Sequence, residues 1–407
     1  MHQFLASMIG IMVIFLTISC QRNICVNDNE YSEEIFKHQF IQFLPEKYKN
    51  TYHEEKEIGI GANGRLIVKR IRIPNMNDFR AQVTIRLRSA GDPWDKAGSC
   101  FIVPVEDPTI VTAIRNGVFP QPSDDLNRKY LAITSYNGYV PAVELMRFMT
   151  PFGVGEFSDN EKYPPPIFVD GWAEYVEWNA EVTDILAACG KEVYIGIWID
   201  TWTSQGYSVD ARIDYTPDRN RQMKGNTRLL PLLNTVFYSP QQNYPDIFAR
   251  SAVDIVAELP KNARNIRLVY TATGHGGHSG GDEFTRKKHS ISVDGREVYA
   301  FTPWRTDCAT FRRYNPSSGV WMAKQKMRYY SEKDGKSVTE EVQVPLASSD
   351  LSRSNWCPGS SVEPEIIPLD NVRSGIHTFT FAIPEAQAIE GDKMNFWLVS
   401  AYLMWEE

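Results

Sequence analysis

The clearest structural signal in the chain is the run Val193-Tyr194-Ile195-Gly196-Ile197-Trp198-Ile199, which leads directly into Asp200-Thr201-Trp202. Every second residue of the run is Val or Ile, and this period of two predicts a β-strand with one face in a core. The other face carries two aromatic residues and ends in a carboxylate. Strands of this kind are typical of an all-β protein.

Similar alternation recurs on both sides of this run, and helical patterns are few. One short helix is predicted at 183–189, with Thr183 as its N-cap and Gly190 as its stop. Asp294-Gly295 predicts a type I′ hairpin turn, because these residues tolerate the positive φ angles that it requires. The Pro- and Gly-rich residues 107–166 predict loops with short strands. Further strands are predicted at Leu66–Ile73, Val83–Leu87, Tyr207–Tyr215, Ile266–Thr271, His377–Ile383 and Met394–Met404.

Length and composition indicate an ordinary globular protein of two domains. The 407 residues exceed the roughly 250–300 that one core usually serves, and a polar break at Thr216–Gln222 separates two strand-rich halves. Hydrophobic residues make up 43% and charged residues 23% of the chain, which excludes a disordered protein. The net charge of −7 argues against a nucleic-acid partner, which needs a basic face. We expect a signal segment (1–20), an N-terminal extension (21–60) and two sandwich or jelly-roll domains (61–217 and 222–407).

The first twenty residues predict export. Phe4–Ile18 is an apolar run that is too short for a membrane span and has the character of a signal peptide. Leu16-Thr17-Ile18-Ser19-Cys20 resembles a bacterial lipobox, in which Cys20 is lipidated after cleavage. Ordinary cleavage without a lipid is the alternative. We expect a periplasmic or cell-surface lipoprotein, secreted if Cys20 carries no lipid, that contacts a membrane only through this anchor.

Three polar segments are candidates for chemistry, and each also has a purely structural interpretation. In Gly91-Asp92-Pro93-Trp94-Asp95-Lys96, an indole and a second acid beside a carboxylate raise its pKa toward the range useful for proton transfer. The alternative is a solvated turn. Asp200-Thr201-Trp202 places an acid and an indole at a strand end, which suits a sugar or simply a strand that leaves the core. Thr273–Phe284 contains five glycines, which let the backbone approach a ligand closely.

Histidines near the glycine-rich segment raise the question of a metal. His275, His278 and His289 are three of the seven histidines, and imidazole is a common metal ligand. The His-x-x-His spacing lacks the rigid helix of an HExxH site, so we expect neither a metal nor a cofactor. Cys308 and Cys357 are candidates for a disulfide in an exported protein, with two free thiols as the alternative.

Together these segments resemble the bacterial peptide-N-glycosidase F family, the amidases that release N-linked glycans from asparagine. Five motifs appear in family order over about residues 80–365. They are Trp94-Asp95-Lys96; Arg147-Phe148-Met149-Thr150-Pro151-Phe152; Asp200-Thr201-Trp202 with Tyr207-Ser208-Val209-Asp210; Glu283-Phe284 with His289-Ser290-Ile291; and Arg353 with Trp356-Cys357-Pro358-Gly359. Five motifs in order, in both halves of the chain, are hard to obtain by chance.

The resemblance implies two eight-stranded antiparallel jelly rolls packed side by side, with the active site between them. It also implies a disulfide between Cys308 and Cys357. Two departures concern the site: Asp200 replaces a Glu and is one methylene shorter, and Lys96 replaces an Arg and lacks its planar fork. The implied catalytic residues are Asp95, Glu283 and Asp200, and the substrate-binding candidates are Trp202, Lys96, Arg353, Trp94 and His275.

The function implied by the resemblance is hydrolysis of the amide between asparagine and the innermost N-acetylglucosamine. This reaction releases the glycan as a glycosylamine and converts Asn to Asp. N-glycosylated proteins or glycopeptides are the expected partners of a monomeric enzyme. Two alternatives stay open: a copper-dependent monooxygenase with His275, His278 and His289 as ligands, and a glycan-binding lipoprotein of the same fold without activity.

Overall fold

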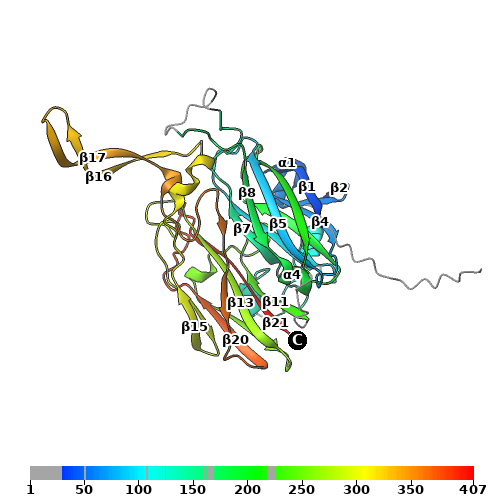
Figure 1. Ribbon diagram of the computed structural model, residues 1–407. Helices are drawn as coiled ribbons and strands as arrows, with labels where there is room; N and C mark the ends of the chain where they lie inside the picture. The colour runs from blue at the N-terminus through cyan, green and yellow to red at the C-terminus, as the bar shows by residue number, and fades with distance from the viewer. Residues whose placement is uncertain are drawn as a thin grey trace, which may run out of the picture.

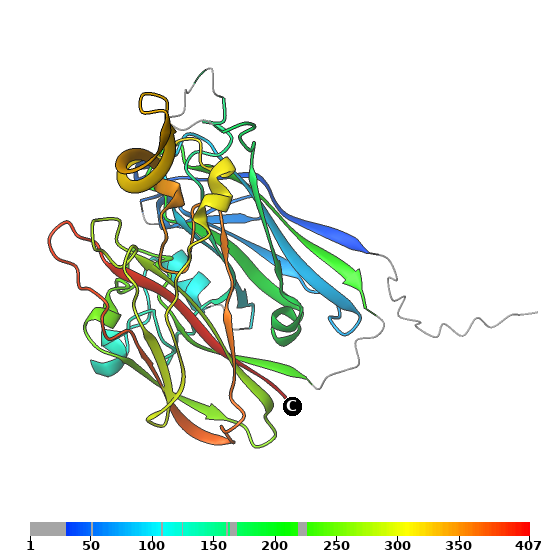
Figure 2. The ribbon, with the colours of Figure 1, turned by 60° about the vertical axis from the view of Figure 1, so that its left-hand side comes forward.

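The computed structural model describes residues 30–49, 52–106, 109–123, 125–159, 162, 169–218 and 226–407. Within them the chain forms two antiparallel β-sandwiches that lie side by side, with short helices around them (Figure 1, Figure 2). This confirms the predicted all-β fold. Among these residues no helix is long and apolar enough to cross a membrane. The predicted signal segment, with Cys20, lies outside the described residues.

The first sandwich packs a four-stranded sheet, in the order β1-β10-β5-β8, against a seven-stranded sheet, in the order β18-β7-β6-β9-β4-β3-β2. An eight-stranded sandwich is thus extended at the edges of its second sheet by β2, β3 and β18. The strands of the first sheet are β1 (Tyr31–Ile41), β10 (Tyr207–Pro217), β5 (Phe79–Ser89) and β8 (Val176–Glu181). Those of the second are β18 (Ser361–Val362), β7 (Val143–Met149), β6 (Ala97–Pro104), β9 (Glu192–Ile199), β4 (Leu66–Arg72), β3 (Ile58–Gly61) and β2 (His53–Glu55).

The second sandwich has two four-stranded sheets, and a separate two-stranded hairpin emerges beside it. One sheet contains β11 (Thr227–Asn234), β21 (Phe396–Glu406), β13 (Arg264–His275) and β19 (Glu365–Pro368). The other contains β12 (Val253–Leu259), β20 (Gly375–Ala382), β14 (His289–Val293) and β15 (Arg296–Phe301). The hairpin is formed by β16 (Val320–Ser331) and β17 (Lys336–Ala347), and the helices are α1 (Pro45–Tyr48), α2 (Thr109–Asn116), α3 (Asp125–Lys129) and α4 (Thr183–Ala188).

The predicted strands, the hairpin turn and the short helix are present, and only the helix cap was assigned wrongly. The alternating run forms β9, which pairs with β4 and β6 on its two sides. Asp294 and Gly295 have φ angles of 51° and 77° between β14 and β15, which confirms the tight turn. Helix α4 begins at Thr183 as predicted, but Val182 is its N-cap. The cap assignment to Thr183 is wrong because its hydroxyl accepts the Ala81 N–H of β5 instead.

Two stretches differ from expectation. The segment expected as an N-terminal extension, 21–60, is built into the first sandwich from Tyr31 onward, since β1 pairs with β10 and buries Ile35 and Phe36. Register shifts within β1 interrupt its alternation, which hides the strand in the sequence. The stretch 107–166 contains two helices that were not expected, together with one strand, β7, all seven residues of which are buried. A strand buried on both faces shows no alternation.

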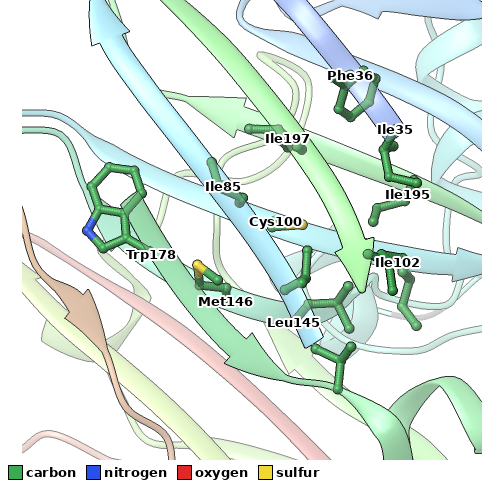
Figure 3. Packing of buried hydrophobic residues seen from close by; sticks show 14 of the residues in the cluster. Ile35, Phe36, Ile85, Cys100, Ile102, Leu145, Met146, Trp178, Ile195 and Ile197 are labelled. Carbon is green, nitrogen blue, oxygen red and sulfur yellow. The ribbon is translucent and has the colours of Figure 1, made fainter. Parts of the chain in front are cut away.

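Each sandwich has its own core. In the first, Ile85 of β5 and Ile195 and Ile197 of β9 belong to one buried cluster, and Figure 3 shows where they lie on the two strands. In the second, Leu268 and Phe379 are completely buried. Burying each such side chain contributes about 1.5–3 kcal/mol, so each sandwich contains enough apolar surface to fix its own strand register.

A third core joins the two sandwiches. Trp198 and Phe101 lie on the outer face of the seven-stranded sheet, where both rings pack against Tyr238 of the second half, with centroids 6.0 and 4.4 Å away. Trp356 and Leu398 belong to the same buried cluster. The aromatic face of β9 therefore faces the other sandwich.

Arg147 ties this interface together with hydrogen bonds. Its side chain is fully buried and forms a two-pronged ion pair with Glu144. Its Nη1 also donates to Thr273 Oγ1 and to the Leu398 carbonyl, both at 2.9 Å. A buried pair of this kind is costly to break, so Arg147 fixes how the sandwiches sit and allows residues from both to form one site.

Candidate active site

The loop after β5 places Asp95 at the junction of the sandwiches. Asp92, in the same loop, is completely buried and accepts hydrogen bonds from Thr201 Oγ1 at 2.6 Å and from the Trp94 N–H at 3.0 Å. Thr150 holds the other end of the loop, because its Oγ1 accepts the Lys96 N–H at 2.8 Å. The two acids of this motif thus have different roles. Asp92 stabilises the loop through its hydrogen bonds, and the Asp95 side chain remains partly exposed to solvent.

Asp200 follows β9 directly and is paired with a buried arginine. Arg65 Nη1 donates to Asp200 Oδ1 at 3.2 Å, and its guanidinium lies 4.4 Å from the centroid of the Trp202 ring. Arg65 Nε is fixed by the Ala62 carbonyl. One arginine therefore sets the position of both an acid and an exposed indole.

Arg353 links the two halves of the site. Its Nε donates to Glu283 Oε1 at 2.9 Å, and its Nη2 lies 3.8 Å from Asp95 Oδ2. The side chain is only 2% exposed and lies between the rings of Phe284 and Trp356, 5.1 and 4.9 Å from their centroids. A carboxyl group from each sandwich thus meets at one buried cation.

Burial dominates the electrostatics of the three acids. It raises the pKa of Asp95 and of Asp200 above the ordinary range, while Arg353 and Lys96 oppose the shift at Asp95, and Arg65 and Lys96 oppose it at Asp200. Burial raises the pKa of Glu283 to about 7; Arg353 opposes this shift, and the charge of Asp95 adds to it. Two carboxyl groups that share one arginine titrate as a pair, which favours keeping a proton between them near neutral pH.

Two exposed tryptophans flank these acids. Trp94 is 57% and Trp202 is 55% exposed, although both follow buried strands. Phe43 supports the second indole, with ring centroids 5.1 Å apart. Exposed, immobilised indoles are stacking surfaces for the apolar face of a sugar, so acids and rings together could orient a glycan and transfer protons beside it.

The three histidines do not gather at one point. His275 is buried between Trp356 and Phe396 and shares a hydrogen bond with Thr273, and burial lowers its pKa to about 3. The predicted substrate contact of His275 gains no support from these neighbours. The other two pair separately, His278 with Asn395 and His289 with Tyr270. In the described part of the chain no three His, Cys, Asp or Glu residues are grouped to hold a metal ion, so the copper hypothesis gains no ligand set.

The predicted disulfide is present. Cys308 and Cys357 are bonded, with their Cα atoms 5.0 Å apart. Cys100 and Cys189 are free and buried.

Arg65 is the residue of the site that the sequence analysis missed. It follows Asn63 and Gly64, both with positive φ, at the start of β4. An arginine in a turn is usually solvated, so its residue type does not indicate a buried role. The sequence feature that could have indicated Arg65 is its position between this turn and a strongly apolar strand.

The sequence matches the same family by direct comparison. Residues 33–215 match the family "Peptide-N-glycosidase F, N terminal" and residues 243–404 match "Peptide-N-glycosidase F, C terminal". The chain belongs to the peptide-N-glycosidase F family. The two matched regions follow the two sandwiches, and the first includes most of strand β1, which pairs with β10 of the first sandwich.

Relatives of known structure share the fold. The structure of PNGF-II is 33% identical in sequence, with a TM-score of 0.78 over 93% of this chain, and the chain covers 65% of that protein's length. Peptide-N(4)-(N-acetyl-beta-D-glucosaminyl)asparagine amidase F from Elizabethkingia miricola is 22% identical over an alignment of 345 positions, which covers 78% of this chain and 80% of that protein. PNGase F from Flavobacterium meningosepticum, described as a glycosylasparaginase, is 15% identical, with a TM-score of 0.55 over 93% of this chain and 96% of its own. At this identity the likeness concerns the fold.

Proposed function

We propose that this protein hydrolyses the amide bond between asparagine and the innermost N-acetylglucosamine of N-linked glycans, leaving Asp in the polypeptide and releasing a glycosylamine. Membership of the peptide-N-glycosidase F family supports an amidase. The observation that carries the proposal is the contact of Arg353 with Glu283 and Asp95, because it joins largely buried carboxyl groups of both sandwiches at one point.

In the proposed reaction, Asp95 acts first as a general base and then as a general acid. As a carboxylate it accepts a proton from a water molecule, whose oxygen bonds to the side-chain carbonyl carbon of asparagine. The carbon–nitrogen bond then breaks, its electron pair leaves with nitrogen, and Asp95 returns the proton to that nitrogen. The cation of Arg353 stabilises the negative charge that develops on the carbonyl oxygen.

The other groups of the site orient the substrate in this scheme. Glu283, whose raised pKa keeps it partly protonated, offers a hydrogen bond to the water or to the sugar. Asp200 and Lys96 bind sugar hydroxyls, and Trp202 packs against a sugar ring. The shorter Asp200 is held by Arg65 at 3.2 Å, a pairing that fixes a carboxylate one methylene shorter than the Glu of the family.

Mass spectrometry on a denatured N-glycoprotein tests this proposal. In water enriched in heavy oxygen, the active protein should convert sequon Asn to Asp that carries the label, and Asp95→Asn should not, at unchanged circular dichroism. Cleavage that leaves one sugar on asparagine would contradict an amidase. Binding without turnover would support the glycan-binding alternative instead.

We also propose that the protein is exported and lipidated at Cys20. The Cys308–Cys357 disulfide supports the first part, because disulfides persist mainly in oxidising compartments. Metabolic labelling with a fatty acid should mark the natural protein and not Cys20→Ser. Label in both proteins, or in neither, would contradict the anchor.

A further inference from the structure

Strands β16 and β17 form a hairpin that leaves the body of the protein (Figure 1). Each strand has twelve residues, paired in continuous register from Val320 with Ala347 to Ser331 with Lys336. At about 3.3 Å per residue the hairpin is about 40 Å long. Among the described residues, the two strands pair only with each other.

The two faces of the hairpin differ in chemistry. Because side chains alternate along a strand and the register is continuous, the members of each face follow directly. We call one the apolar hairpin face; Gln325 and Glu340 interrupt it, and Ser331 and Lys336 stand at its outer end. Its apolar members are Trp321, Ala323, Met327, Tyr329, Val338, Val342, Val344 and Leu346. The opposite face is more polar. Its polar members are Lys324, Lys326, Arg328, Ser337, Thr339, Glu341 and Gln343, and its apolar members are Val320, Met322, Tyr330, Pro345 and Ala347. Two of these, Met322 and Tyr330, are well exposed.

The apolar hairpin face is open to solvent. Trp321 is 50%, Met327 41% and Tyr329 40% exposed. A two-stranded hairpin is marginally stable by itself, and three strands or a packing partner are the usual remedy. Contiguous exposed apolar side chains typically mark an interaction surface.

This face begins at the proposed active site. The Trp321 ring lies 6.5 Å from that of Phe284, which directly follows Glu283 in the chain. The Phe284 ring in turn lies against Arg353. A molecule that is bound along the hairpin therefore reaches the acids of the site at the end marked by Trp321.

We propose that the apolar hairpin face binds the unfolded polypeptide that flanks the glycosylated asparagine. The inference rests on the proposed function and adds its substrate class: unfolded glycoproteins with apolar residues near the glycan. The apolar members of the face are mostly aliphatic, and they suit apolar amino-acid side chains better than sugar hydroxyls, which need polar partners. A folded glycoprotein keeps such residues inside. The free edges of both strands offer backbone hydrogen bonds to an extended chain.

Two glycopeptides that carry the same glycan test the proposal. The short glycopeptide has a single residue on each side of the glycosylated asparagine. The long glycopeptide has about ten mostly apolar residues beside that asparagine, enough in extended form to run along most of the hairpin. The test variant Met327→Ser/Val338→Thr/Val342→Ser changes only the outer part of the apolar face, away from Trp321. The matched control Lys324→Ser/Arg328→Ser/Gln343→Ser changes the opposite face.

For the long glycopeptide we expect kcat/KM of the test variant to fall about tenfold, mainly through KM, because buried apolar contact is lost. The short glycopeptide should be cleaved at the rate of the natural protein. The control variant should match the natural protein on both. An equal loss on both substrates, or no loss on either, would overturn the docking proposal.

A binding measurement separates this proposal from the reaction itself. Fluorescence anisotropy with the long peptide lacking its glycan should show binding to the natural protein and the control, and weaker binding to the test variant. If the natural protein cleaves neither glycopeptide yet shows this pattern, the proposed reaction fails and docking stands. Two other outcomes would overturn the docking proposal. A dimer in light scattering that disappears in the test variant would assign the face to a second copy of the chain. Binding to phosphatidylglycerol vesicles that disappears in the test variant would assign it to a membrane.

Discussion

Arg353 and Glu283, 70 residues apart in the chain, are joined by a 2.9 Å hydrogen bond, and the same guanidinium reaches toward Asp95 of the other sandwich. The arginine is buried and the acid has a pKa of about 7. The pair therefore combines a fixed positive charge with a carboxyl group that changes its charge near neutral pH.

Arg353→Lys should lower kcat about 100-fold, the effect typical of removing one donor to a developing oxyanion. Lysine keeps the charge, but it cannot hold Glu283 and approach Asp95 at the same time. Loss of the contacts with Phe284 and Trp356 should also lower the free energy of unfolding by about 1–2 kcal/mol. Release assays and urea titration measure the two effects, with Arg312→Lys, whose partner is Asp350, as the control. Full activity in Arg353→Lys would exclude the arginine from the reaction.

Glu283→Gln should change how stability depends on pH. A carboxyl group whose pKa is raised by folding favours the folded state when protonated, so its stabilisation is present at pH 4 and is lost as pH rises through about 7. The loss approaches about 3 kcal/mol when ionisation is complete. We expect the Tm of the natural protein to fall between pH 5 and pH 8 by more than that of Glu283→Gln, in thermal melts across this range. Parallel curves would mean that Glu283 is ionised throughout.

Arg65→Lys should raise KM by about threefold to tenfold with a smaller change in kcat, because the planar contact with Trp202 and the hold on Asp200 are weakened. If Arg65 acts through the indole, the effects of Arg65→Lys and Trp202→Ala should be non-additive in a double-mutant cycle. Arg86→Lys is the control, since that guanidinium also lies over an aromatic ring, Tyr175 at 4.1 Å, on the first sandwich. Additive effects would assign Arg65 to the fold alone.

Reduction of the Cys308–Cys357 bond should lower the free energy of unfolding by about 4 kcal/mol, the chain-entropy value for a separation of this size. The separation is 49 residues, and the closed segment carries both the hairpin and Arg353. We therefore expect activity to fall together with stability when Cys308→Ser/Cys357→Ser is compared with the natural protein. Unchanged activity at lowered stability would show that the bond supports only the fold.

Local patterns predicted what depends on neighbours in sequence. The turn at Asp294-Gly295 and strands such as β9 and β10 need only alternation and turn residues, and they were predicted correctly. Short strands were expected somewhere in 107–166, but β7 was not located within that stretch, because both of its faces are buried and the alternation disappears. The hairpin β16–β17 was not predicted either, since it has no core to sharpen the contrast between its faces.

The acids of the site could be predicted from family motifs in the sequence, but how they are arranged could be seen only in the folded structure. Asp95 and Asp92 look equivalent in the sequence, yet Asp95 keeps a small exposed surface beside Arg353, whereas Asp92 is completely buried and bonded to Thr201. Arg65 carries no motif, because its role depends on the turn at Asn63 and Gly64 that directs it beneath Trp202. The residue type indicates which chemistry a side chain can perform, and long-range packing determines which of several aspartates in the sequence is placed to perform it.

The core between the sandwiches also bears on how the two halves are inherited. Phe101 and Trp198 are buried only because the other half covers them with Tyr238, and Arg147 would lose Thr273 and Leu398 together. A gene rearrangement that separated the halves would expose the aromatic interface of each half to water and make both halves prone to aggregation. Because each half covers side chains of the other, we expect the two sandwiches to be inherited as one unit.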